Sequence, residues 1–164
     1  RLHPNDLVRI IRALEVYETS GEIMKEFEES FVQNDEYNFI LIGLDRQRDE
    51  LYDRINKRVD ILIENGLIGE VEGLLEKGLT EANIAMKGIG YKEVISYLHD
   101  EYDLDTAIDL IKRNSRRYAK RQLTWFRRYD SMKWFKIEKN SLKDDIINDI
   151  LTYIDKHNEG SIKI

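Results

Sequence analysis

One short apolar segment constrains the fold of this chain more than any other feature. Residues 39–44 are Phe-Ile-Leu-Ile-Gly-Leu, which is apolar on both alternating faces. That pattern is typical of a strand buried on both sides in a parallel or mixed sheet. Such a strand needs strands beside it and helices over its faces. The sequence offers one other good strand, residues 132–137, so we expect the remaining strands of the sheet to belong to a longer protein.

Helical periodicity accounts for most of the other residues. Apolar side chains recur at three- and four-residue steps from Leu7 until Ser20-Gly21, after a cap-like start at Asn5-Asp6. The same spacing predicts a helix capped by Asp45 that ends at 65–66, a shorter one ending at Gly78, and others at 94–98, 105–128 and 141–157. Residues 22–36 are expected to form a loop or a short helix, and 159–164 a mobile tail. The chain should be predominantly α-helical with about two strands.

Composition narrows the class of protein. The 164 residues are 41% hydrophobic and 35% charged, with one proline, as expected of a helix-rich globular protein. The absence of cysteine excludes disulfides and thiolate metal sites, and it favours a reducing, cytoplasmic location. No apolar run is long enough to span a membrane. The chain opens on Arg1 directly before a well-formed motif, so we expect that upstream sequence has been removed.

Charge is distributed unevenly along the chain. The net charge is −6, yet residues 112–128 contain eight basic residues and no acidic one. On a helical wheel one side of this segment should be core, formed by Ile111, Tyr118, Gln122 and Trp125. The opposite side carries Arg113, Arg116, Arg117, Lys120, Thr124 and Arg127. A solvated charged face is the ordinary explanation. A face without acids is also suited to RNA phosphate, because an anion relieves the repulsion among like charges.

Two other segments could bind phosphate. Residues 87–92, Lys-Gly-Ile-Gly-Tyr-Lys, combine two glycines, two cations and an aromatic ring, which would let backbone N–H groups approach a phosphate. Arg54 and Arg58 lie four residues apart on one predicted helix face and could grip a single diphosphate. An ordinary helix-entry turn and surface pairing with nearby aspartates are the respective alternatives. No histidine has metal-ligand spacing, and no catalytic triad or G-x-x-x-x-G-K-[ST] loop is present.

Four strings together resemble the bacterial tRNA dimethylallyltransferase (tRNA isopentenyltransferase) family in order and spacing. They are L-H-P-N-D with R-I-I-R-A-L-E-V-Y at 2–17, L-Y-D-R-I-N-K-R-V at 51–59, G-I-G-Y-K-E at 88–93 and R-Y-A-K-R-Q-L-T-W-F-R at 117–127. The resemblance covers nearly the whole chain and corresponds to the C-terminal half of the family's length.

This resemblance implies a P-loop NTPase-like α/β parent fold that binds dimethylallyl diphosphate instead of hydrolysing ATP. Residues 1–36 would end a helical insertion that grasps the tRNA anticodon stem-loop, and 37–164 would form the C-terminal part of the core. Arg54 and Arg58 would neutralise the diphosphate leaving group. The implied tRNA-binding residues are Arg9, Arg12, Lys87, Gly88, Gly90, Tyr91, Lys92, Arg113, Arg117, Lys120, Arg121, Gln122, Thr124 and Arg127.

The reaction implied is transfer of the dimethylallyl group to N6 of adenine 37, a base drawn out of its stack. Mg²⁺ and the aspartate that assists proton removal would belong to the missing half, and the parent enzyme would be monomeric. The chain alone would then bind tRNA without catalysing transfer. Two alternatives stay open at this point: an adenylate isopentenyltransferase, which would need no long tRNA-facing helix, and a non-catalytic RNA-binding module.

Overall fold

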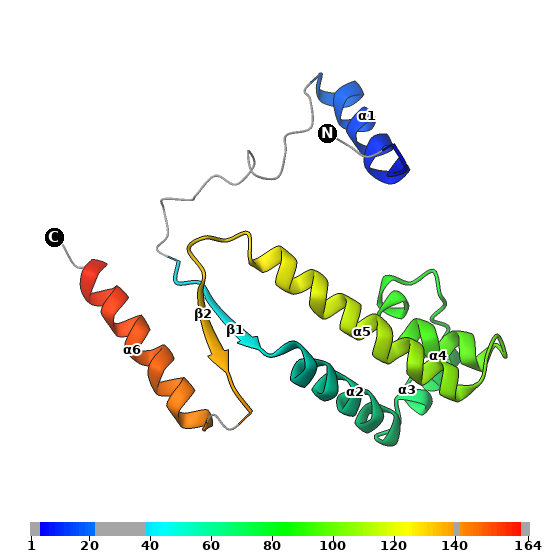
Figure 1. Ribbon diagram of the computed structural model, residues 1–164. Coiled ribbons are helices and arrows are strands. Elements are labelled where there is room, and N and C mark those ends of the chain that lie inside the picture. Colours follow the sequence, from blue (N-terminus) through cyan, green and yellow to red (C-terminus); the bar gives the residue numbers. More distant parts are fainter. Residues whose placement is uncertain (1–3, 22–38, 140–141, 162–164) are drawn as a thin grey trace. The chain divides into compact units, whose positions relative to one another are not determined.

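The computed structural model describes residues 4–21, 39–139 and 142–161 and forms two compact units, Arg1–Phe39 and Ile40–Ile164 (Figure 1). The first unit contains α1, Leu7–Ser20, with Asp6 and Gly21 as its caps. A carboxylate oxygen of Asp6 accepts the N–H of Arg9 at 3.3 Å, and Gly21 adopts the left-handed conformation that favours glycine. Both predicted ends of this helix are confirmed. The segments 22–36 and 162–164, for which a loop and a tail were predicted, lie outside the described residues.

The second unit contains five α-helices, a 3-10 turn and two strands among its described residues. In chain order they are β1 Ile42–Arg46, α2 Arg48–Glu64, α3 Leu67–Glu76, η1 Ile84–Lys87, α4 Tyr91–Leu98, α5 Leu104–Phe126, β2 Lys133–Ile137 and α6 Lys143–Ser161. The predominance of helix with two strands is therefore as the sequence predicts. The last helix continues to Ser161, beyond the predicted end at 157 and into the predicted tail.

The two strands pair in parallel, with Gly43 opposite Trp134. The absence of a side chain at Gly43 matters here, because a Cβ would lie 2.5 Å from Cε3 of the Trp134 ring. The strand begins and ends later than predicted. Asp45 is consequently a strand residue opposite Lys136, and Gln47, which makes no side-chain capping bond, precedes α2. The prediction that Asp45 caps this helix was wrong, because the register draws that residue into the sheet.

The burial expected on both faces of β1 is not observed. Gly43 is buried, but Leu44 is 54% exposed. Within the described part of the chain the sheet has two strands, and β2 also contacts α6. The closing helix was expected to complete the core, yet Leu151 on α6 is exposed, and so is Leu142 directly before that helix. Isolated two-stranded sheets are marginal in water, so the sheet is the weakly supported part of this unit.

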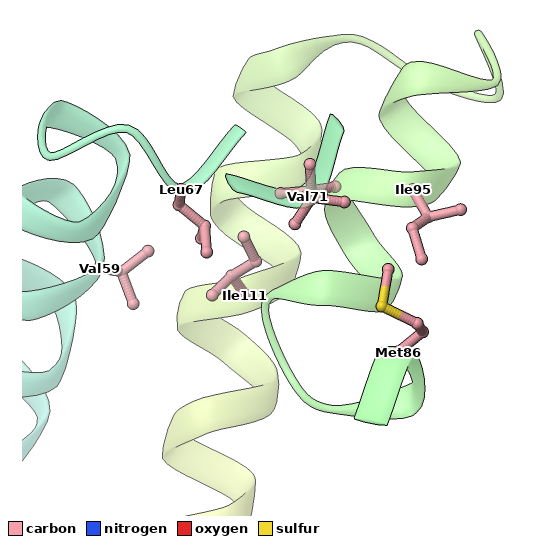
Figure 2. Packing of buried hydrophobic residues seen from close by; sticks show 7 residues of the cluster. Val59, Leu67, Val71, Met86, Ile95 and Ile111 are labelled. Carbon is pink, nitrogen blue, oxygen red and sulfur yellow. The ribbon is translucent and has the colours of Figure 1, made fainter. Parts of the chain in front are cut away.

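The buried core lies instead among the helices (Figure 2). Side chains from α2, α3, η1, α4 and α5 converge there. The cluster consists of Val59, Leu67, Val71, Met86, Val94, Ile95 and Ile111. Fully burying an aliphatic side chain of this size contributes roughly 1.5–3 kcal/mol, so this cluster dominates the stability of the unit. It also fixes α4 and α5 side by side.

The core face predicted for α5 is correct only in its first half. Ile111 is buried, whereas Tyr118 and Trp125 are 49% and 44% exposed and Gln122 is also exposed. Helix α5 packs on both α4 and α2, and its fully buried residues, Ala107 and Ile111, lie in its first half. Arg116, predicted on the exposed side, instead donates to Oδ1 of Asn56 on α2 at 2.6 Å. No described helix is long and apolar enough to cross a membrane.

Candidate functional site

The turn at residues 87–92 connects η1 to α4. Gly90 has φ +103°, a conformation that L side chains rarely adopt, and it is buried. Its N–H donates to Oε2 of Glu93 at 2.7 Å, so the helix begins at Tyr91, three residues earlier than predicted. Lys87, Gly88 and Lys92 are exposed, and Nζ of Lys92 lies 3.5 Å from Oε1 of Glu93. The turn therefore combines a backbone conformation that suits glycine with side chains that a ligand can reach.

The tyrosine of the turn is held by a contact that the sequence did not indicate. The hydroxyl of Tyr91 donates to Oε1 of Glu70 on α3. This hydrogen bond, together with partial desolvation and the nearby negative charge, raises the pKa of Tyr91 above its ordinary value. The phenol is therefore neutral at physiological pH, and its orientation is set by α3. A base could stack on the ring only in this fixed direction.

The cations of α5 divide into an inward and an outward group. Lys112 pairs with Asp60 at 2.6 Å, which directs its charge toward α2, as Asn56 does for Arg116. The predicted tRNA-facing members of the helix are all exposed. They are Arg113, Arg117, Lys120, Arg121, Gln122, Thr124 and Arg127.

Aromatic rings accompany these exposed cations. The guanidinium of Arg121 lies 5.7 Å from the ring centre of Tyr118, and that of Arg128 lies 5.4 Å from Trp125. Cations beside aromatic faces are suited to nucleic acid, because phosphate and base can be contacted together. The outer side of α5 is therefore a mixed cationic and aromatic surface rather than a plain charged face.

A cationic hollow of about 420 Å³ lies where β1 ends and α2 begins. In open parallel sheets this carboxyl edge is the usual position for ligands. Its cations are Arg46, Arg48, Lys120, Arg127 and Lys136. Asp45 is the acid in its lining, and its Oδ2 lies 3.6 Å from Nη2 of Arg127. Arg46, Lys136 and Asp45 were not predicted as site residues from the sequence, because the pairing of β1 with β2 is needed to bring Lys136 beside Asp45 and Arg46.

The two arginines expected to grip a diphosphate line different hollows. Arg54 lines one beside the cationic hollow, together with Lys57 and Lys139. Arg58 lines a largely apolar one, together with Tyr91 and the buried core of α5. Both side chains are exposed. The structure therefore does not bring them together around one site within the described residues, and joint binding of a diphosphate stays a prediction.

The cations of α1 make local contacts. Nε of Arg9 lies 3.7 Å from Asp6, and Nη1 of Arg12 lies 3.2 Å from Glu15. Both pairs are exposed, and exposed ion pairs are worth about 0–1 kcal/mol. A stronger anion could displace either acid at little cost. The prediction that these two residues face tRNA stays open.

Comparison with known proteins places this geometry in a family. The model of the IPP transferase family matches residues 1–129. The chain belongs to the IPP transferase family. Among the curated members, it is 50% identical over 151 residues to the tRNA dimethylallyltransferase of Alkaliphilus oremlandii, covering 92% of this chain and 48% of that protein. It is 54% identical over 144 residues to that of Halothermothrix orenii, covering 87% of this chain and 44% of the relative.

A solved structure with the family's activity in its name is similar to this chain. The tRNA isopentenylpyrophosphate transferase of Bacillus halodurans matches with a TM-score of 0.73 at 41% identity, over 98% of this chain and 48% of that one. The chain thus spans about half the length of the curated relatives it matches. Every site residue predicted from the sequence lies within the 129 residues that the family model matches, whereas Lys136 of the cationic hollow lies beyond them.

Proposed function

We propose that this chain is the part of a tRNA dimethylallyltransferase that binds the anticodon stem-loop and contributes arginines to the diphosphate site. The observation that carries the proposal is the exposed cationic side of α5, in a chain about half identical to enzymes named for this activity. Phosphate contacts supply most of the affinity of such surfaces. An acidic protein of net charge −6 concentrates its cations here, which favours one defined RNA-binding side.

The reaction that the family's names describe is prenylation of tRNA, and we assign it to N6 of adenine 37. N6 attacks the allylic carbon of dimethylallyl diphosphate, the C–O bond breaks, and pyrophosphate leaves with the bonding electrons. A proton is then lost from N6, and the product is N6-(dimethylallyl)adenosine. Arg54 and Arg58 would stabilise the negative charge that grows on the leaving oxygen. Since they line separate hollows, each would contact a different part of the diphosphate or move on binding.

The remaining parts of the reaction are assigned to the half of the longer relatives that this chain does not match. There we place the P-loop-type fold with its phosphate loop, the aspartate that assists proton removal, and Mg²⁺, which would neutralise diphosphate charge. In the segments 4–21, 39–139 and 142–161, no three His, Cys, Asp or Glu side chains gather into a metal site. These residues therefore do not fit the ion. We further propose that the longer enzyme is monomeric and cytoplasmic.

An adenylate isopentenyltransferase is less well supported, because a free nucleotide needs no helix bearing seven exposed polar or cationic side chains. A plain RNA-binding role is consistent with this chain when it is separated from the phosphate loop. The test below distinguishes specific from general RNA binding.

The deciding measurement is binding of the chain to an anticodon stem-loop with adenine at position 37, against a loop-scrambled RNA of equal length, across a salt series. We expect tighter binding to the cognate loop and an affinity that falls as salt rises. Equal affinities for the two RNAs, with a steep salt dependence, would show that α5 binds RNA phosphate without preference for the anticodon loop. Failure to bind either RNA would reject the proposal.

A further inference from the structure

A buried carboxylate lies behind the turn at residues 87–92. Glu93 is 3% exposed. Its Oε2 accepts the N–H of Gly90 at 2.7 Å, and its Oε1 accepts Nδ2 of Asn114 at 2.7 Å. Nζ of Lys92 lies 3.5 Å from the same Oε1. Each oxygen thus has a partner, as a buried charge requires.

The bond to Gly90 determines how the chain enters α4. Gly90 adopts a positive φ, and its N–H points at the carboxylate three residues later, which is the usual geometry of a helix N-terminus closed by glutamate. From the other side of the helix, the hydroxyl of Tyr102 donates to the backbone oxygen of Glu93 at 3.0 Å. The direction in which Lys87 and Lys92 leave the turn therefore depends on where this glutamate is held.

The bond to Asn114 attaches the same turn to α5. Asn114 follows Arg113 directly, and its neighbours three and four residues on are Arg117 and Tyr118. Because its amide shares Oε1 with the ammonium of Lys92, the charge of that lysine lies against this stretch of α5. The cations of the turn and those of the helix consequently belong to one surface.

We propose that Glu93 and Asn114 are positioning residues for RNA binding. They hold the turn against α5 so that the lysines of the turn and the arginines of the helix contact successive phosphates of one RNA strand. Glu93 itself is too buried, and has the wrong charge, to meet phosphate. This inference rests on the proposed function and deepens it. A purely structural role for the pair would lower stability without altering the number of phosphate contacts.

The first test compares Asn114→Ala with Asn56→Ala. Both asparagines are half-buried and tie a neighbouring helix to α5, but Asn56 bonds Arg116 away from the turn. We expect Asn114→Ala to bind the anticodon stem-loop about fivefold to tenfold more weakly at 0.1 M salt. The slope of log K against log salt should also become shallower by about 0.7–0.9, the contribution of one phosphate contact. Asn56→Ala should lower the thermal midpoint similarly and leave the slope unchanged.

The second test remains decisive if Asn114→Ala does not fold. Asn114→Asp places two carboxylates against each other and should weaken RNA binding. Adding Glu93→Gln exchanges the two roles: the new amide at position 93 can donate to the new carboxylate at position 114. The pair then has its original net charge, so RNA affinity and the slope of its salt dependence should recover. A double variant no better than Asn114→Asp overturns the inference. So does an unchanged slope in Asn114→Ala, provided the unaltered chain binds the stem-loop. If the unaltered chain does not bind, the proposed function fails and the inference falls with it.

Discussion

Arg127 pairs with Asp45 and is exposed enough to bind a phosphate as well. Its guanidinium lies 3.6 Å from Asp45 and is 61% exposed, at the rim of the cationic hollow. An exposed pair of this kind is worth roughly 0–1 kcal/mol. A phosphate can therefore replace Asp45 at little cost, and the aspartate holds the arginine in a direction suitable for that exchange.

We expect Arg127→Ala to weaken binding of the anticodon stem-loop and to make the slope of log K against log salt shallower by about 0.7–0.9, since one phosphate contact is lost. Lys77→Ala, which removes an exposed cation at the end of α3, is the matched control and should leave the slope unchanged. Asp45→Asn should keep or improve affinity, because the arginine stays available. If Asp45→Asn is as damaging as Arg127→Ala, the arginine supports the fold and does not contact RNA.

At the scale of elements, one glycine in β1 and one in α3 have different surroundings. Gly43 of β1 faces the Trp134 ring of β2, with no room for a methyl group. Gly73, within α3, has no neighbouring atom within 4 Å of the position a Cβ would take. Two glycine-to-alanine changes therefore probe opposite situations in one chain.

Gly43→Ala should displace the tryptophan ring and destabilise the strand pair by about 1–3 kcal/mol, the usual cost of overpacking. Gly73→Ala should instead stabilise its helix by roughly 0.5–1 kcal/mol. In a Trp125→Phe background, fluorescence of Trp134 reports the strand pair, and far-ultraviolet circular dichroism reports the helices, both followed in urea. Similar effects of the two changes would show that the close packing of Gly43 on Trp134 is not a feature of the folded protein in solution.

In the molecule as a whole, the described helices enclose a buried core, whereas the two-stranded sheet does not. Seven core residues come from α2, α3, η1, α4 and α5, and the sheet consists of two strands with an exposed Leu44. Of the cations proposed to face RNA, Arg113 and Arg117 follow the buried Ile111 on α5, whereas Lys120 and Arg127 line the hollow at the end of β1. The hollow at the carboxyl edge of the sheet, where a diphosphate would need a phosphate loop, lies on the part with less support.

We therefore expect the chain by itself to transfer no labelled dimethylallyl group to tRNA above background, although it binds the RNA. Its sequence contains no G-x-x-x-x-G-K-[ST] loop to hold the diphosphate. The intact enzyme of a relative serves as the positive control. Supplying the half of that relative which this chain does not match should restore measurable transfer. Robust incorporation by the chain alone would contradict the division of roles proposed here.

The spacing of apolar residues was sufficient to predict the helices and the two strands that pair, because local spacing decides which face of an element is apolar. It failed in the second half of α5. Tyr118 and Trp125 have the spacing of core residues, yet both are exposed, because spacing does not show whether another element covers that face. Arg116 is likewise drawn inward by Asn56 of α2, although its neighbour Arg117 in the basic run is exposed.

The sequence by itself determined the helical class, the basic segment and the family resemblance, all of which depend on residues close together in the chain or on their order. Only the tertiary structure decided which cations share a surface. Glu93 and Asn114 are 21 residues apart, and the hollow joins the end of β1 to the end of α5. Such contacts depend on packing between distant elements, and neither local spacing nor composition specifies them.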